Sequence, residues 1–235
     1  MRIWDVSPGY LNRQSLLGEH RELHGIVSII GKGMKGYSKH PETLRWAGYG
    51  WALQQRHRIL VAEMELRGYK DSSPVVTGAR EGSWPESYVD EPFRQFRILQ
   101  AKYRERENGR IPLPENVQEL WSHHKYSVLS RDESLYRRIG PEIAGDTGSD
   151  FRALARLMID ILRRAPTAGG LRNAIQHMWG HVSDSHPGFS GRTDSWPLAD
   201  LLREIQERAL TREDRYMLSS TALSELMAWI TLRKE

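Results

Sequence analysis

The chain has 235 residues, of which 39% are apolar and 9% aromatic, and it contains no cysteine. This composition is typical of a folded protein, and the length allows one large domain or two small ones. The absence of cysteine excludes disulfide bonds, thiolate metal sites, iron–sulfur clusters and cysteine nucleophiles. No apolar run is long enough to cross a bilayer, and the first residues do not have the pattern of a secretory signal. We therefore expect a cytoplasmic protein that does not bind a membrane.

The net charge of +4 is unevenly distributed along the chain. Residues 1–110 carry 18 basic and 13 acidic side chains, whereas the remaining residues carry 16 and 17. An excess of positive charge in one half is typical of a protein with a polyanionic partner such as nucleic acid. A basic surface that is merely solvated gives the same count, so charge alone does not decide between the two.

Apolar residues recur at intervals of three and four along nearly the whole chain, which predicts an all-α fold. We expect helices at residues 11–31, 42–67, 88–107, 114–131, 149–164, 169–184, 197–209 and 211–232. Segments rich in Gly, Ser and Pro separate some of them, and the one at 71–87 could close over a ligand or simply connect two helices. Residues 107–116, with a glycine and two prolines, predict a linker. We therefore expect two small helical domains in tandem, at 1–110 and 115–235.

The first predicted helix has two distinct faces. The apolar face, expected to lie in the core, comprises Leu16, Leu23, Ile26, Val27 and Ile30. The opposite face comprises Gln14, Gly18, Arg21, Glu22 and Gly25. Each glycine inside a helix costs about 1 kcal/mol relative to alanine, so a bulky group is expected to approach the backbone there. That group could be a substrate or another helix, and the neighbouring Arg and Glu could equally be surface charges.

The amino terminus resembles that of the pyrimidine-dimer DNA glycosylases, the phage endonuclease V family. The segment that carries the resemblance is MRIWDVSPGYLNRQSLLGEHRELHGI, in which EHREL is similar to the EYREL of the family's catalytic helix. A second block at 57–74, HRILVAEMELRGYKDSSP, is similar to a family helix that ends in a basic residue, a glycine and an aromatic residue. The two blocks together span about the first 75 residues.

This resemblance implies a DNA-repair enzyme that uses the α-amine of Met1 as its nucleophile and the carboxylate of Glu22. Free α-amines have a pKa of about 8, so a fraction is unprotonated at neutral pH and can attack the sugar C1′ of a damaged nucleotide. Such a glycosylase and apurinic-site lyase expels the base, forms an imine and breaks the strand by β-elimination. Since Arg2 is too large for ordinary removal of the initiator methionine, Met1 itself is expected to be the nucleophile.

Contacts with DNA are expected from side chains around these two residues. Arg21, beside Glu22, is expected to support catalysis by holding a phosphate. Arg2 and Gln14 match family positions that contact DNA. A glycine-rich loop is expected at residues 31–41, after the first helix. Its Lys35 and Lys39 could make further contacts with the DNA backbone, although this loop could also be merely solvated. The expected partner is double-stranded DNA with damaged bases, and the reaction needs no metal or other cofactor.

Residues 121–182 resemble a different family, an uncharacterised helical domain found fused to thiouracil desulfurases. The matching blocks are HHKYSVLSRDESLYRRIG at 123–140 and APTAGGLRNAIQHMWGHV at 165–182. The resemblance implies an association with nucleic acid or nucleobases but no catalytic residues. His177 and His181 have a spacing that zinc sites use, but the only candidates for a third ligand are His123, His124 and His186. We therefore expect histidines that pack or donate hydrogen bonds there, without a metal.

Three alternatives remain open. The first two are a non-catalytic module that binds DNA or RNA and a glycosylase for a different lesion. Three features are consistent with them: the retained Met1, the Gly25 that stands where the family usually has a basic residue, and the unusual carboxyl-terminal domain. A structural helical protein is the third reading. Its association with DNA would depend little on salt, unlike a complex dominated by phosphate contacts.

Overall fold

The computed structural model describes residues 1–145, 150–183 and 195–232, and every regular element in these ranges is a helix. The all-α fold class expected from the sequence is therefore confirmed. The chain forms two compact units, Met1–Gly109 and Arg110–Glu235. Within the described ranges, no helix combines the length and the apolar character that a membrane crossing requires.

The first unit is built around α1, which packs on α2 and α3. Its elements are the 3-10 helix η1 (Pro8–Tyr10), α1 (Arg13–Lys32), α2 (Pro41–Trp46), α3 (Gly50–Leu66) and α4 (Pro92–Tyr103). Asn12 caps the start of α1, where its side chain accepts a hydrogen bond from the backbone N–H of Ser15, and Gly33 ends the helix in the left-handed conformation. The loop expected to close over a ligand or connect two helices joins α3 to α4, and its Thr77 contacts Gly50 at the start of α3.

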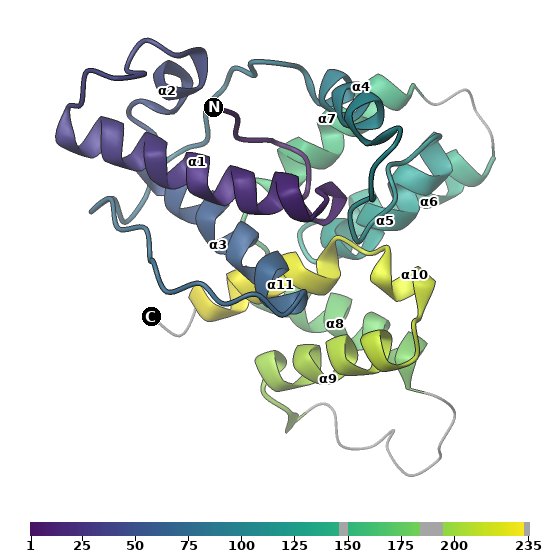
Figure 1. Cartoon of the computed structure of the whole chain (residues 1–235). Helices are drawn as coiled ribbons and strands as arrows, with labels where there is room; N and C mark the ends of the chain where they lie inside the picture. The colour runs from purple at the N-terminus through teal and green to yellow at the C-terminus, as the bar shows by residue number, and fades with distance from the viewer. Residues whose placement is uncertain (146–149, 184–194, 233–235) are drawn as a thin grey trace. The chain divides into compact units, whose positions relative to one another are not determined.

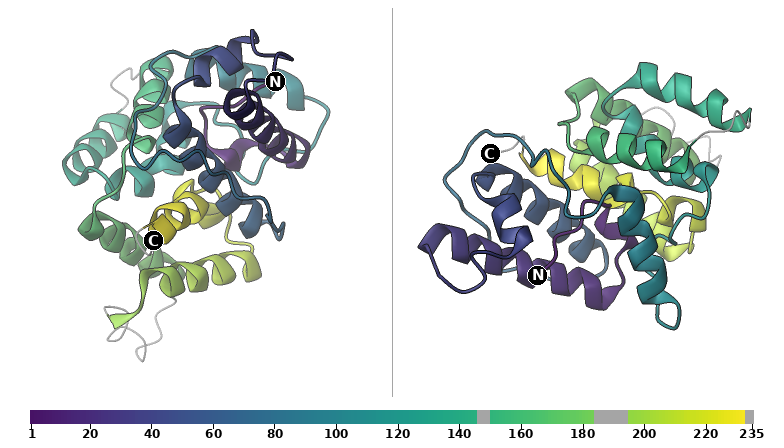
Figure 2. Two further views of the ribbon diagram at one scale, coloured as in Figure 1. Left: turned by 90° about the vertical axis from the view of Figure 1, so that its left-hand side faces the viewer. Right: turned by 90° about the horizontal axis from the view of Figure 1, so that it is seen from above.

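The first seven residues form an extended segment that lies beside α1 (Figures 1 and 2). Its buried apolar side chains are Ile3, Trp4 and Val6. Side chains from the helices, rather than a neighbouring strand, bind its backbone groups. Gln95 Oε1 of α4 accepts hydrogen bonds from the backbone N–H of Asp5 (2.8 Å) and of Val6 (3.4 Å). These bonds satisfy polar groups that burial would otherwise leave without a partner.

A buried ion pair joins the two main helices of this unit. Arg56 of α3 binds both carboxylate oxygens of Glu19 on α1, at 2.7 Å from Nε and 3.0 Å from Nη2. Burial raises the pKa of Glu19 to about 7, because desolvation of the carboxylate outweighs the attraction of Arg56. Arg56 Nη1 also donates to the carbonyl oxygen of Val6, at 3.1 Å. One guanidinium therefore connects α3, α1 and the N-terminal segment.

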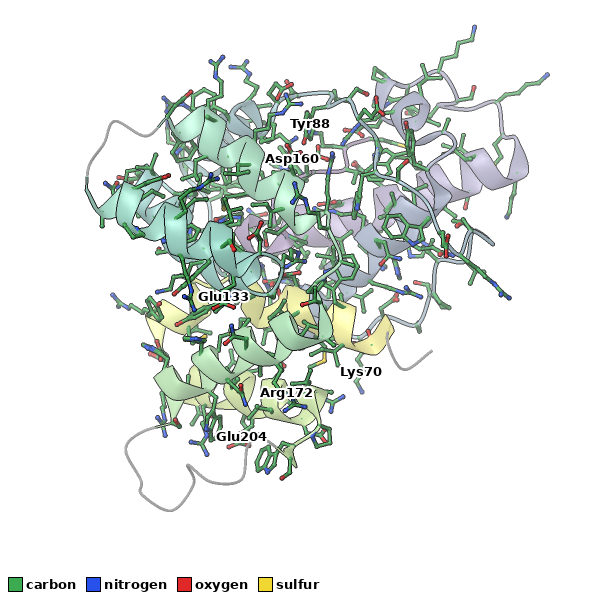
Figure 3. The ribbon with its side chains drawn as sticks, turned by 180° about the vertical axis from the view of Figure 1, so that it is seen from behind. Lys70, Tyr88, Glu133, Asp160, Arg172 and Glu204 are labelled. Atoms are coloured by element: carbon green, nitrogen blue, oxygen red, sulfur yellow. The ribbon has the colours of Figure 1, made fainter. Side chains whose placement is uncertain are left out.

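The second unit is built around α5, which packs against α6, α7, α8 and α11. Its elements are α5 (Val117–Leu129), α6 (Glu133–Ala144), α7 (Phe151–Leu162), α8 (Ala168–Val182), α9 (Leu198–Thr211), α10 (Arg215–Leu218) and α11 (Ala222–Leu232). Figure 3 shows Arg172 on α8 and Glu204 on α9. These two helices pack together. A second buried ion pair, between Arg131 and Glu225 at 2.9 Å, ties the end of α5 to α11.

Two of the expected helices are interrupted. The helix expected at 42–67 is divided into α2 and α3, because the chain turns at Gly48 with a φ of 86°. The helix expected at 211–232 is divided into α10 and α11, where the backbone N–H of Thr221 donates to the carbonyl oxygen of His123 at 2.8 Å. This bond links segments far apart in the sequence, so periodicity could not reveal it.

Two further expectations are corrected. Helix α6 is absent from the helices expected from the sequence; Asp132 caps its start by accepting a hydrogen bond from the backbone N–H of Leu135 at 2.8 Å. On α1, the core contact expected of Ile30 is made by Ile29 instead, and Ile30 is 37% exposed. Glu19 also lies on the buried face, where its pairing with Arg56 compensates its charge.

The substitution Arg56→Met tests the ion pair of the first unit. It leaves the buried carboxylate of Glu19 without its guanidinium, so we expect the free energy of unfolding to fall by about 3–5 kcal/mol. Denaturant titration, with hydrogen exchange of the α1 amides, measures the change. The double variant Arg56→Met with Glu19→Leu should recover most of the loss, because both charges are removed. The exposed Arg13, replaced by Met, is the control, and an equal effect there would contradict the prediction.

Histidine burial in α5 makes the second unit sensitive to acid. Burial lowers the pKa of His124 to about 3 and that of His123 to about 4, so below pH 6.5 the unfolded chain binds more protons than the folded one. Stability is therefore complete above pH 6.5 and falls as the pH drops, by up to about 1.4 kcal/mol per pH unit for each residue.

The substitution His124→Gln removes one of these two groups. Between pH 6.5 and pH 5 we expect the variant to lose about 2 kcal/mol less unfolding free energy than the parent. Hydrogen exchange of the α5 amides at each pH measures the difference. The substitution His177→Gln, at an exposed position of α8, should leave the pH dependence unchanged. Identical slopes for the parent and His124→Gln would rule out this origin.

Candidate functional site

The amino group of Met1 lies at the end of the extended segment, against α1 and the residue that precedes α2. Met1 N is 3.4 Å from Nε2 of His40, and the backbone N–H of Arg2 donates to Oε2 of Glu22. A Cβ atom on Gly25 would lie 3.9 Å from Sδ of Met1. Glu22, which the sequence resemblance pairs with Met1, thus contacts the backbone of the residue next to Met1.

His40 is not among the site residues expected from the sequence, although the loop that contains it was singled out. It caps α2, where its Nδ1 accepts a hydrogen bond from the backbone N–H of Glu42 at 3.2 Å. A neutral imidazole whose Nδ1 is an acceptor carries its proton on Nε2, which is the atom that faces Met1. His40 can therefore donate a hydrogen bond to an unprotonated amine. The signal in the sequence is its position before Pro41, at the start of a helix.

Arg2 turns its guanidinium towards the unit itself. Its Nη1 lies 2.5 Å from Oδ2 of Asp90, and its Cζ lies 4.3 Å from the centre of the Trp4 ring. Nε and Nη2 of Arg2 are buried and have no hydrogen-bond partner among the described residues. Buried donors of this kind call for a further acceptor, such as a water molecule or an oxygen of a bound ligand.

The other expected contact residues lie on exposed surfaces. Gln14 and Arg21 are exposed on the outer face of α1, where Gln14 Oε1 accepts from Nη1 of Arg106 at 3.2 Å. Lys35 and Lys39 are exposed in the loop between α1 and α2. Within that loop, it is His40 whose side chain contacts Met1.

Helix α4 adds basic residues to the outer face of α1. Lys102 Nζ donates to Oγ of Ser15 at 2.9 Å. Burial lowers the pKa of Lys102 and repulsion from Arg106 adds to this effect, whereas attraction to Glu22 opposes it. Lys102 and Arg106 were not expected as site residues, because only the packing of α4 brings them to this face.

Gly18 and Gly25 lie on the same side of α1. Apart from its chain neighbours and the backbone of α1 itself, no atom of the described residues lies within 4 Å of the place where a Cβ on Gly18 would stand, and a Cβ on Gly25 would contact only the side chain of Met1. Close packing against another helix, one of the two readings of these glycines, is therefore not found in the described part of the chain. The outer face of α1 remains accessible to a large ligand.

A second polar cluster joins α1, α3 and the turn that follows α3. It consists of His20 and His24 on α1, His57 on α3, and Asp71, whose ligand atoms all lie within 4.8 Å of one another. Ser73 orients the carboxylate, since its Oγ and its backbone N–H donate to Oδ1 of Asp71 at 2.7 Å and 3.1 Å. No metal site is expected from the sequence in this half, where the available signal is the separation of four residues between His20 and His24 within EHRELH.

The electrostatics of this cluster favour neutral imidazoles at His20 and His57 beside a charged carboxylate. Burial lowers the pKa of His57 to about 4, and burial together with repulsion from His24 lowers the pKa of His20. Burial acts to raise the pKa of Asp71, but hydrogen bonds from Ser73 and attraction to the histidines outweigh it, so the pKa is lowered. The imidazole lone pairs and the carboxylate are therefore available to bind a cation.

The histidines of the second unit do not form a comparable group. His181 Nε2 lies 3.1 Å from Oδ2 of Asp214, and its ring lies 4.4 Å from that of Tyr216. His177 is exposed, and His186 lies outside the described residues. Among the described residues, the cluster on α1 and α3 is the one group with the arrangement of metal ligands.

Comparison with known families identifies two regions of the chain. Residues 1–77 match the family described as pyrimidine dimer DNA glycosylase, and residues 125–188 match a family described as a protein of unknown function, DUF1722. Both resemblances expected from the sequence are thereby confirmed. The first match points to the chemistry of a DNA glycosylase. No curated protein and no solved structure matches the chain.

Proposed function

We propose that this protein is a DNA glycosylase and apurinic-site lyase that acts on pyrimidine dimers, with the α-amine of Met1 as its nucleophile. The observation that carries the proposal is that Met1 N lies beside His40 while the backbone N–H of the next residue, Arg2, donates to Glu22, inside the region that matches the glycosylase family. An amine can supply the nucleophile and a carboxylate the general base for covalent catalysis at a sugar carbon.

The proposed reaction begins when the Met1 nitrogen attacks C1′ of the damaged nucleotide. The bond between C1′ and the base breaks, and its electron pair leaves with the base, which takes up a proton. Loss of a proton from nitrogen and opening of the sugar ring then give an imine. Glu22 stabilises the positive charge that develops on the sugar and next removes the C2′ proton. The electron pair released there expels the 3′ phosphate, and water finally hydrolyses the imine.

His40 is proposed to position the amine before the attack. With its proton on Nε2, it can donate to the lone pair of the Met1 nitrogen at the observed 3.4 Å, and this hydrogen bond breaks when the same lone pair attacks C1′. Its Nδ1 is engaged by the backbone of α2, so the ring has one orientation to offer. Placing a nucleophile in this way supplies part of the rate enhancement without any charge on the imidazole.

The outer face of α1 is proposed to carry the DNA backbone. Arg21 and Lys102 provide positive charge, and Gln14 and Arg106 extend this face towards the start of the helix. Lys35 and Lys39, in the loop between α1 and α2, are proposed to contact further phosphates. The open space over Gly18 allows the duplex to approach the helix backbone, and the damaged nucleotide would be extruded towards Met1.

Borohydride trapping tests the proposed chemistry. Untagged protein with a free Met1 is incubated with a duplex that contains one cyclobutane pyrimidine dimer, and borohydride reduces any imine to a stable adduct. We expect an adduct whose peptide mass maps to Met1, and a rate of formation at least about 100-fold lower for Glu22→Gln. Chemical blocking of the α-amine should abolish the adduct.

Undamaged and abasic duplexes separate the alternatives. Trapping on abasic DNA alone would contradict pyrimidine-dimer specificity and favour a glycosylase for another lesion. No trapping on any duplex, together with salt-dependent binding, would favour the non-catalytic module. The exposed Arg137 of α6, replaced by Gln, is a control that should leave the trapping rate unchanged.

The substitution Gly18→Leu tests the proposed DNA face. Leucine favours the helix, so α1 should keep its structure, but the new side chain would fill the space proposed for DNA. We expect at least a tenfold weaker affinity for duplex DNA at fixed salt, measured by fluorescence anisotropy. Gly31→Leu is the matched control, since Gly31 also has open space but points to a different side of α1. Equal affinities for the two variants would argue against this face.

A further inference from the structure

We infer that His20, His24, His57 and Asp71 form a four-coordinate binding site for a divalent transition metal, with Zn²⁺ as the ion that fits best. The four ligands come from α1, α3 and the turn after α3, all within the first unit. The inference does not depend on the proposed glycosylase activity, because it concerns a separate group of side chains.

Several distances between the ligand atoms are close to those of a tetrahedral site, and all of these atoms lie within 4.8 Å of one another. His20 Nε2 lies 3.2 Å from Nε2 of His57, 3.3 Å from Nε2 of His24 and 3.3 Å from Oδ1 of Asp71. His57 Nε2 lies 3.5 Å from Oδ2 of Asp71. In a tetrahedron with metal–ligand bonds of about 2.0–2.1 Å, the ligand atoms are about 3.3–3.4 Å apart. His20, with three ligand atoms within 3.3 Å of its Nε2, already has this spacing, and an ion would draw the more distant ligand atoms inwards.

Hydrogen bonds among these side chains cannot satisfy the arrangement by themselves. The Nε2 atom of a neutral imidazole is either a donor or an acceptor, and it has one direction in which to act. Nε2 of His20 nevertheless faces two other Nε2 atoms and a carboxylate oxygen. A proton on it can serve the carboxylate, but it then leaves no lone pair for the two other imidazoles. A cation accepts all of these lone pairs at once.

The ligand types narrow the choice of metal. Three imidazole nitrogens and one carboxylate oxygen suit Zn²⁺ and neighbouring transition metals, whereas Ca²⁺ and Mg²⁺ prefer oxygen ligands. Four protein ligands also fill a tetrahedral shell, which is typical of structural zinc sites; catalytic sites keep one position for water. The site is therefore assigned a structural role.

The position of the site explains what a bound metal would do. His20 and His24 are one helical turn apart on α1 and bracket Glu22, while His57 lies next to Arg56 on α3. A metal would join the two helices beside the Glu19–Arg56 ion pair, since His20 follows Glu19 and His57 follows Arg56, and it would also hold the turn at Asp71. Ser73 would act as an outer partner that keeps the Asp71 carboxylate in place. The bound ion would thereby fix the segment of α1 that presents Glu22.

Metal analysis of the full chain, purified without a histidine tag, tests this inference. We expect about one zinc ion per chain after dialysis, by plasma mass spectrometry. For the metal-free protein, competition with a chromophoric chelator should show that His24→Ala weakens Zn²⁺ binding by more than 100-fold. Ser73→Ala should weaken it by about 10- to 100-fold, as expected for loss of an outer partner. Circular dichroism shows whether each variant remains folded.

His177→Ala is the matched control, since it removes a helical histidine from the second unit. It should bind Zn²⁺ as the parent does. Substitution with Co²⁺ reports the geometry, because a four-coordinate Co²⁺ ion absorbs visible light much more strongly than a six-coordinate one. A folded parent that binds neither ion, equal binding by His24→Ala and His177→Ala, or a six-coordinate spectrum would each overturn the inference.

Discussion

The first unit depends on one buried guanidinium. Arg56 binds Glu19 through two hydrogen bonds and the carbonyl oxygen of Val6 through a third, so it connects three segments that are distant in the sequence. A carboxylate removed from water is stable in its charged form only when a partner compensates it. The pair therefore constrains how α1, α3 and the N-terminal segment pack, since a shift of any one of them would leave a charge or a carbonyl group unpaired.

This constraint determines where the chain begins in space. Among the residues that the structure describes, no strand lies beside the N-terminal segment. Its backbone is bound by Gln95 and Arg56, and its apolar side chains enter the core. Termini are usually mobile, because few contacts hold them. Here the contacts leave Met1 with a defined neighbour on each side, His40 and the Glu22 region of α1. A chain terminus can serve as a nucleophile only if it is held in this manner.

Helix α1 carries three kinds of residue on three sides. Its buried side holds Glu19 and the apolar core, a second side carries His20 and His24, and its outer face carries Gly18, Glu22 and Gly25. The helix is thus attached to α3 both by the ion pair and by the histidine cluster. Attachment on two sides of the helix restricts its rotation and its sliding, and the position of Glu22 follows from this rigidity.

The sequence by itself determined the helical fold class, through a periodicity that repeats over most of the chain, and it indicated the pairing of Met1 with Glu22 through a motif of short range. It did not reveal α6, nor the breaks at Gly48 and near Thr221, because caps and distant hydrogen bonds compete there with periodicity. Several residues come from segments other than α1, namely His40, Lys102 and, in the histidine cluster, His57 and Asp71. Single residues without a local spacing leave no pattern to recognise. Only the tertiary structure decided which of them meet, since burial of the charged and apolar groups of α1 fixes its neighbours. Those neighbours complete the surroundings of Met1 and the histidine cluster.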